Sequence, residues 1–221
     1  MTEAICVVSC VWQRLERLSY TLDMLSRQTH TDFVAWFIIN NVEVRKVAEE
    51  LIAEYPFTHS IANEQNRGPF ARIEVMHQLK DDHDWFMTID DDLIFDETLL
   101  ASWWQRRNAN AVQGWKGFKF VDGYWTRTKV ADGEPCQYLW GSNLFVPATV
   151  VQDYRIRYLD ERWWQCDDLW LCYWANHECG LELMQQSVEV SINVDGKDTY
   201  PSQHDRKQEC LEMLMAKGWA I

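Results

Sequence analysis

The stretch WFMTIDDDLIF, residues 85 to 95, places three consecutive aspartates directly after an apolar run. Aspartate is depleted in strands and is almost never fully buried unless it is paired. Clustered carboxylates also repel one another until a cation neutralises them. Asp90, Asp91 and Asp92 therefore indicate either an acidic turn at the end of a strand or a site for a divalent cation, and both interpretations stay open at this point.

A second acidic pair, Asp167 and Asp168, opens the segment CDDLWLCYWANHECG, which predicts a helix from about 167 to 177. The positive end of a helix stabilises an ionised carboxylate, whereas repulsion between two neighbouring carboxylates keeps one of them basic. The pair is a candidate general base. The alternative is a pair of ordinary capping acids, which are common at helix starts.

Length, composition and charge narrow the class of protein. The chain has 221 residues, of which 47% are apolar, and this suffices for one domain with a sizeable core. The formal net charge is −13, from 34 acidic and 21 basic residues, which argues against a nucleic-acid partner.

The cysteines and the start of the chain indicate a compartment. The seven cysteines show neither a CxxC pair nor a zinc-like spacing, so we interpret them as small hydrophobic residues in a reducing compartment. The start, MTEAICVVSC, lacks the regions of a signal peptide, and no apolar run approaches the roughly 18 residues of a membrane span. We expect a cytoplasmic protein without a transmembrane segment, and the sequence carries no signal for an oligomeric state.

Apolar runs and helical spacings alternate through the first half of the chain. Short apolar runs predict strands at 4–11, 32–40, 57–63 and 85–89. Apolar spacing predicts helices at about 15–28, 42–55 and 70–80, the second with an apolar face of Val44, Val47, Leu51 and Ile52. Such an alternation is typical of an open, mixed, mostly parallel α/β sheet flanked by helices.

Ligands of such sheets bind outside the carboxyl ends of the strands. Val11, Trp12 and Asn40 come at those ends, as do the three aspartates, so we expect them to converge on one edge. The second half is less regular, with strands expected at 115–126 and 136–146 and an amphipathic helix in the tail HDRKQECLEMLMAKGW.

Several segments stand in a familiar order. ICVVSCVWQRLERLSYTLDMLSRQTHTDFVAWFIINN resembles the opening of glycosyltransferases of the GT-A fold, family 2-like. NRGPFAR is similar to that family's Asn-x-Gly-x-x-x-Ala-Arg loop, IDDD stands where the family has its DxD motif, and CDDLWLC resembles its acceptor-side acidic pair. The chain departs from the family where Cys10, Val11 and Trp12 replace Pro-Thr-Tyr and where Asn40 replaces an aspartate.

The resemblance implies a Rossmann-like GT-A fold in a single domain, 1–221, with a nucleotide-sugar-binding half, 1–100, and an acceptor-binding half, 101–221. It implies a metal-dependent, inverting glycosyltransferase that moves a sugar from a nucleotide-diphosphate sugar, with UDP favoured, to a hydroxyl acceptor such as a glycan. The implied cation is Mn²⁺ or Mg²⁺, because both prefer hard oxygen ligands.

The resemblance also assigns residues to this site. It implies metal ligands at Asp92, Asp90 and His204, and a catalytic base at Asp168 with Asp167 beside it. The implied donor contacts are Val11, Trp12, Arg14, Asn40, Arg72, Asp90 and Asp91, with Trp12 stacking on the base and Arg72 hydrogen-bonding to it.

Tryptophans gather in two segments of the second half, 122–142 and 161–170. Indole rings often stack on sugars, and a glycine lets the backbone approach a ligand closely. We therefore expect an acceptor pocket that includes Trp140, Gly141, Trp163 and Trp164. The alternative is that this aromatic cluster belongs to the core or to a dimer interface.

Two other classes of protein remain as alternatives. A haloacid-dehalogenase-like phosphohydrolase would use Asp90 and Asp92 with Lys116 and the later acidic pair, but its nucleophile normally follows the first strand of the fold. A non-enzymatic carbohydrate-binding protein would stack tryptophans on sugar and hold Ca²⁺ with the aspartates. Such modules are usually all-β, which conflicts with the predicted alternation.

Overall fold

The computed structural model describes residues 5–192 and 203–221, without the side chains of residues 203–205. Its main sheet has seven strands in the order β11-β6-β10-β4-β1-β2-β3. β10 runs antiparallel to both of its neighbours, and the other paired strands of this sheet are parallel. The expected open, mixed, mostly parallel sheet is confirmed. Its strands are β1 (Ile5–Val11), β2 (Phe33–Ile39), β3 (Thr58–Ala62), β4 (Trp85–Ile89), β6 (Ala111–Gly114), β10 (Leu144–Pro147) and β11 (Glu182–Gln185).

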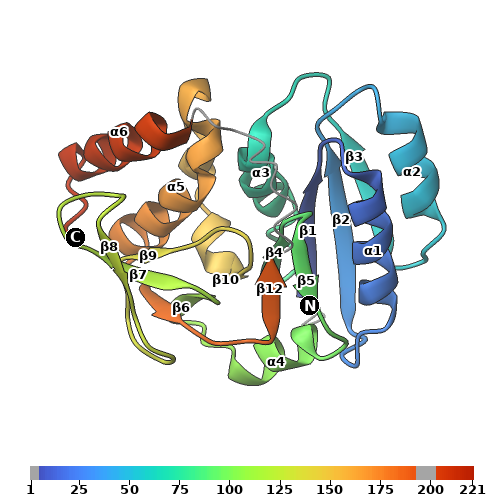
Figure 1. Cartoon of the computed structure of the whole chain (residues 1–221), viewed down its shortest axis with the longest axis horizontal. Coiled ribbons are helices and arrows are strands. Elements are labelled where there is room, and N and C mark those ends of the chain that lie inside the picture. Colours follow the sequence, from blue (N-terminus) through green and yellow to red (C-terminus); the bar gives the residue numbers. More distant parts are fainter. Residues whose placement is uncertain (1–4, 193–202) are drawn as a thin grey trace.

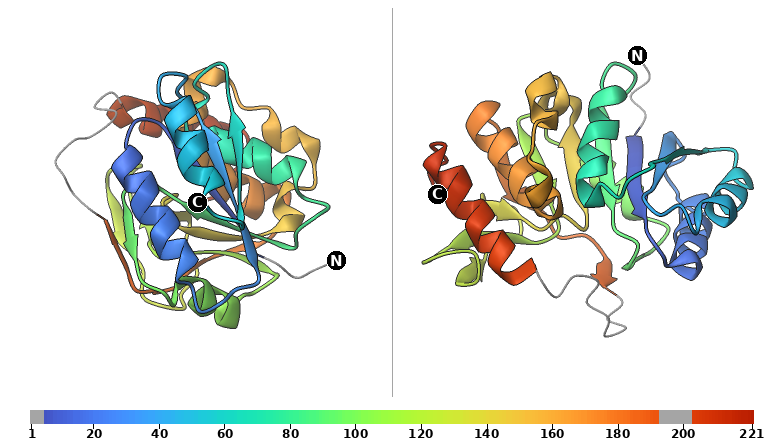
Figure 2. Two further views of the ribbon diagram at one scale, coloured as in Figure 1. Left: turned by 90° about the vertical axis from the view of Figure 1, so that its right-hand side faces the viewer. Right: turned by 90° about the horizontal axis from the view of Figure 1, so that it is seen from above.

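Helices cover both faces of this sheet (Figures 1 and 2). One core cluster joins the sheet to α1 (Leu15–Ser26), α2 (Arg45–Ala53) and α4 (Leu99–Arg106). The other joins it to α3 (Ala71–Gln78), α5 (Asp167–Tyr173) and α6 (Gln203–Ala216). Successive residues of β1 point to opposite faces, so Ile5 and Val7 enter the first cluster and Cys6 and Val8 enter the second. Burying each such side chain contributes about 1.5–3 kcal/mol, so the apolar run of β1 holds both layers of helices.

The second half adds two smaller sheets. β7 (Gly117–Phe120), β8 (Arg127–Lys129) and β9 (Tyr138–Leu139) pair antiparallel in the order β8-β7-β9, and β5 (Leu93–Phe95) pairs with β12 (Val190–Ile192). The strand expected at 115–126 is observed only over Gly117–Phe120, because the chain turns after Phe120 so that β8, which begins at Arg127, can pair back onto β7. The strand expected at 136–146 is divided into β9 and β10.

Two predicted helices differ from those observed. α2 begins at Arg45 and buries Ala48 and Ile52, whereas Val47 remains 46% exposed. Its contact face is therefore narrower than the apolar spacing predicts. α5 ends at Tyr173 and continues as a π-helical turn, Trp174–Glu178.

All seven cysteines are free thiols, and four of them are buried. In the described part of the chain, no helix has both the length and the apolar character needed to cross a bilayer.

Candidate active site

The carboxyl ends of the parallel strands bring the predicted donor residues to one edge of the sheet. β1 lies between β2 and β4, with Val11 opposite Ile39 and Ser9 opposite Ile89. Asp90 begins a tight turn directly after β4, in which the Leu93 amide donates to the Asp90 carbonyl at 3.2 Å. The amide of Asp90 donates to the carbonyl of Ser142 at 3.0 Å, which anchors this turn to the segment before β10.

Arg72 lies at the centre of this edge and is only 2% exposed. Its Nη1 donates to the carboxylate of Asp90, and its Nη2 donates to Oδ2 of Asp167 at 2.6 Å. The carbonyls of Gly141 and Pro69 accept from the same guanidinium. Arg72, predicted as a contact to the nucleotide base, is thus the cation that joins the aspartate turn to the acidic pair of α5.

The loop before α3 fixes the position of Arg72. Gly68 has φ of +58°, a left-handed backbone that favours glycine, and a Cβ there would lie 2.7 Å from Nε2 of Gln165, which would have to shift. Asn40, also predicted to touch the base, donates to the Gly68 carbonyl at 2.9 Å and accepts from Asn63 at 2.8 Å. Both polar ends of the Asn40 amide are therefore used to hold this loop.

Asp168 is almost fully enclosed by hydrogen-bond donors. Its Oδ1 accepts from the ammonium of Lys207 on α6 and from the Leu169 amide, and its Oδ2 accepts from the hydroxyl of Tyr138. Burial by itself raises the pKa of Asp168, but Lys207 and these hydrogen bonds outweigh it and hold the pKa below its ordinary value. The carboxylate of Asp168 is thus a stabilised anion at the contact between α5 and α6.

Asp167 has a different environment, although it is adjacent in the chain. Burial raises its pKa, and the neighbouring Asp168 adds to the rise, against the opposing effect of Arg72. Among the described residues only Arg72 hydrogen-bonds to the Asp167 carboxylate, through Oδ2. Asp167 therefore binds a proton more tightly than Asp168 does, and its carboxylate accepts fewer hydrogen bonds.

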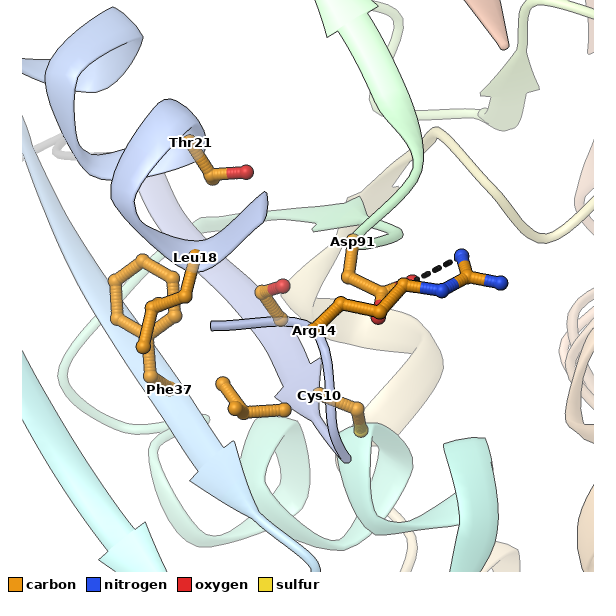
Figure 3. A pocket seen from close by; sticks show the side chains of 8 residues that line it. Cys10, Arg14, Leu18, Thr21, Phe37 and Asp91 are labelled. Carbon is orange, nitrogen blue, oxygen red and sulfur yellow. Dashed lines mark hydrogen bonds and ion pairs between the residues drawn. The ribbon is translucent and has the colours of Figure 1, made fainter. Parts of the chain in front are cut away.

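A small pocket lies on the α1 side of the aspartate turn (Figure 3). It is lined by Ser9, Cys10, Val11, Arg14, Leu18, Thr21, Phe37 and Asp91. Nη1 of Arg14 lies 3.5 Å from Oδ1 of Asp91 across its mouth. Burial raises the pKa of Asp91 to about 6, partly offset by Arg14 and reinforced by Asp90 and Asp92. Arg14, Val11 and Asp91 thus line one pocket, and Trp12 lies half-buried directly after β1.

The sequence matches the family described as glycosyl transferase family 2 over residues 6–164. The chain belongs to glycosyl transferase family 2. The matched region includes Arg72 and the aspartate turn and ends just before Asp167. A comparison with curated protein sequences finds no match.

Solved structures with the GT-A fold resemble this family 2 chain at low sequence identity. GalNAc-T7 with UDP, GalNAc and Mn²⁺ has a TM-score of 0.64 at 11% identity, and the match covers 84% of this chain and 42% of that one. TarS 1–349 of S. aureus with UDP-GlcNAc has a TM-score of 0.62 at 13% identity, with 90% and 61% covered. The mannosyltransferase PcManGT of Pyrobaculum calidifontis with GDP-Man and Mn²⁺ has a TM-score of 0.59 at 8% identity, with 83% and 54% covered. The chain thus has the GT-A fold and spans about half the length of these proteins.

The aspartate turn of this family 2 chain has the donor chemistry for a hard divalent cation. Among the described side chains, no group of three or more histidine, cysteine or acidic residues is arranged to hold a metal. Mg²⁺ and Mn²⁺ commonly take one or two carboxylates and complete their coordination with phosphate oxygens and water. Asp90 and Asp92 therefore fit a cation that binds together with a diphosphate. His204, the third predicted ligand, lies in the first turn of α6, and its side chain is outside the described residues.

The structure separates the tryptophans that the sequence grouped together. Trp163 is 6% exposed and belongs to the core cluster that includes α3 and α5. Trp164 is half-buried beneath the Arg67 guanidinium, which lies 4.2 Å from its ring centroid. Trp140 is also half-buried and is followed by Gly141, where a Cβ would lie 2.8 Å from Cβ of Asp168. Of these four predicted residues, Gly141 is thus the one that lies directly against Asp168.

Sequence reasoning missed two residues of this site, Lys207 and Tyr138. Lys207 carried a signal, because it has helical spacing with Cys210, Leu211 and Leu214, all of which are buried in α6. A lysine on the apolar face of a helix predicts a buried acidic partner. Tyr138 carried no comparable signal, since an aromatic residue in an apolar run is most simply a core residue.

Proposed function

We propose that this chain is a metal-dependent, inverting glycosyltransferase that moves a sugar from a nucleotide-diphosphate sugar to a hydroxyl of a glycan acceptor. The observation that carries the proposal is the pair of contacts made by Arg72, which joins Asp90 after β4 to Asp167 at the start of α5. One buried guanidinium thus holds together a donor-side carboxylate and a candidate base. The family match and the GT-A fold support the same activity.

The donor is a nucleotide-diphosphate sugar, and we favour a UDP-linked one. Two of the similar structures contain UDP or a UDP-sugar and one contains GDP-Man, which supports the class of donor. The strand ends around Arg14 and Trp12 would hold the nucleotide, because they line the edge where ligands of open α/β sheets bind. Mn²⁺ or Mg²⁺ held by Asp92 and Asp90 would act as a Lewis acid and neutralise the charge that develops on the leaving diphosphate.

Inversion requires a carboxylate that takes the proton of the acceptor hydroxyl on the face opposite the leaving group. The family resemblance assigns this role to Asp168, but all the hydrogen bonds of Asp168 point into the protein, toward Lys207, Tyr138 and Leu169. We therefore propose Asp167 as the base. Its raised pKa suits proton transfer, and Arg72 orients it beside Asp90.

A titration with UDP tests the proposed function. The intact chain should bind UDP in the presence of Mn²⁺, and chelation of Mn²⁺ should weaken that binding. Asp92→Ala should lose the Mn²⁺-dependent part, whereas Asp84→Ala, an acidic residue before β4, should retain it. UDP binding that is equal with and without Mn²⁺, or release of phosphate from phosphate esters, would contradict the proposal.

A further inference from the structure

Trp115 and Trp140 form an aromatic platform with a lysine at its centre. Their ring centroids lie 6.1 Å apart and their planes are within 13° of parallel. Nζ of Lys116 lies 4.1 Å from the centroid of Trp115 and 4.2 Å from that of Trp140. All three side chains are partly exposed, so each of them presents some surface to a ligand.

The platform is fixed to the candidate active site by hydrogen bonds. Nε1 of Trp115 donates to the Ser142 hydroxyl at 2.8 Å, and the Trp140 amide donates to the Lys116 carbonyl at 3.0 Å. The Ser142 carbonyl accepts from the Asp90 amide. A ligand on the platform would therefore lie next to Asp90, on the side opposite the pocket formed by Arg14 and Asp91.

The cations near the platform lack acidic partners, unlike most cations of the chain. Among the described residues no carboxylate oxygen lies within 4.0 Å of the side-chain nitrogens of Lys116, Lys119, Arg127 or Lys129, whereas fourteen ion pairs connect cations to carboxylates elsewhere. Burial lowers the pKa of Lys116, and the charge of Lys129 lowers it further. In a chain with a net charge of −13, these four cations remain available to pair with an anion, although the platform also adjoins Asp90.

We propose that Trp115, Lys116 and Trp140 form an acceptor subsite for a sugar unit that carries a phosphate or a carboxylate. The sugar ring would stack on an indole, and the anionic group would pair with Lys116. The inference rests on the proposed glycosyltransferase function and adds the chemical class of its acceptor. The acceptor is favoured over the donor because the platform belongs to the segments that flank β7 and β9, and its residues are not among those that line the pocket formed by Arg14 and Asp91.

Binding of simple sugars to the intact chain tests the subsite. Glucose 6-phosphate and glucuronate should each bind about tenfold more tightly than glucose, as expected for one charge-assisted contact. Lys116→Gln should remove this preference, Lys116→Arg should retain it, and Trp140→Ala should weaken the binding of all three sugars. Lys46→Gln, at a lysine of α2 whose side chain is 88% exposed, is the matched control and should behave as the parent chain.

The outcomes separate the subsite from the proposed function. Equal binding of the neutral and anionic sugars, or a preference that survives Lys116→Gln, would overturn the subsite. Binding of all three sugars that Trp140→Ala leaves unchanged would also overturn it, because the indole would then make no contact with the sugar ring. If Lys116→Gln weakens UDP binding in Mn²⁺ as much as sugar phosphate binding, Lys116 serves the donor and the acceptor assignment is wrong. If the parent chain does not bind UDP but still prefers anionic sugars to glucose, the proposed glycosyltransferase function is contradicted and the subsite is not.

Discussion

Arg72 donates from Nη2 to Oδ2 of Asp167 at 2.6 Å, although 95 positions separate the two residues in the sequence. Both side chains are buried, and the same guanidinium also pairs with Asp90. The planar fork of an arginine can serve two carboxylates at once, which the single ammonium of a lysine does poorly. This contact therefore sets the distance between the end of β4 and the start of α5.

Removing this guanidinium should strongly destabilise the fold. Arg72→Met leaves two carboxylates without their shared cation, and breaking a buried pair in this way costs about 3–5 kcal/mol in the free energy of unfolding. Arg72→Lys keeps the charge and should lose less. Urea denaturation followed by tryptophan fluorescence measures both. A midpoint for Arg72→Met equal to that of the parent chain would show that the contact contributes nothing.

The two acidic residues of α5 should differ in their effect on turnover. Asp167→Asn should retain UDP binding in Mn²⁺ and lower kcat at least about a hundredfold, since general base catalysis contributes at least that much. Asp168→Asn should act through stability, so its kcat per folded molecule should fall much less. Single-turnover assays at a temperature where both variants are folded make the comparison. If Asp168→Asn is folded but inactive while Asp167→Asn is active, Asp168 is the catalytic base and the proposal for Asp167 is wrong.

The pair formed by Asp168 and Lys207 should make the free energy of unfolding depend on pH in the acidic range. The pKa of Asp168 is lowered in the folded chain, so its contribution is complete above the ordinary carboxyl pKa of about 4 and is lost as the pH falls through the native value. The pKa of Lys207 is raised, so the lysine stays charged throughout this range.

We therefore expect Asp168→Asn to cost about 3–5 kcal/mol at pH 7, because it leaves Lys207 buried without its partner. The difference from the parent chain should persist down to about pH 4 and shrink below it. Urea denaturation at a series of pH values measures this difference. A constant difference down to about pH 2 would show that Asp168 has an ordinary pKa.

Two tryptophans predicted for one pocket should respond differently to truncation. Trp163→Ala removes a buried ring from the core and should cost about 3–5 kcal/mol in unfolding free energy. Trp140→Ala, at the half-buried platform, should cost far less and should raise the KM for the acceptor. Thermal denaturation and acceptor kinetics distinguish the two effects. Equal losses of stability would place Trp140 in the core as well.

The sequence by itself determined the strands and helices of the first half. Period-2 and period-3.6 spacings are local properties, so β4 was predicted at its observed bounds, Trp85–Ile89, and α1 within a few residues of its own. Because parallel strands share one carboxyl edge, the position of Asp90 at that edge followed from the same pattern. The bounds of the strands beyond residue 110 did not follow from local spacing, since the pairing of these strands depends on partners far away in the chain.

Only the tertiary structure decided what the charged residues do. Asp167 and Asp168 follow each other on a helix, where successive side chains point about 100° apart, so one faces Arg72 and the other faces Lys207. Which of them faces which partner depends on how α5 is rotated against α3 and α6, and no local pattern contains that rotation. For the same reason the sequence did not reveal that Arg72 pairs with two carboxylates, because burial of a guanidinium is favourable only where the fold brings its anions to it.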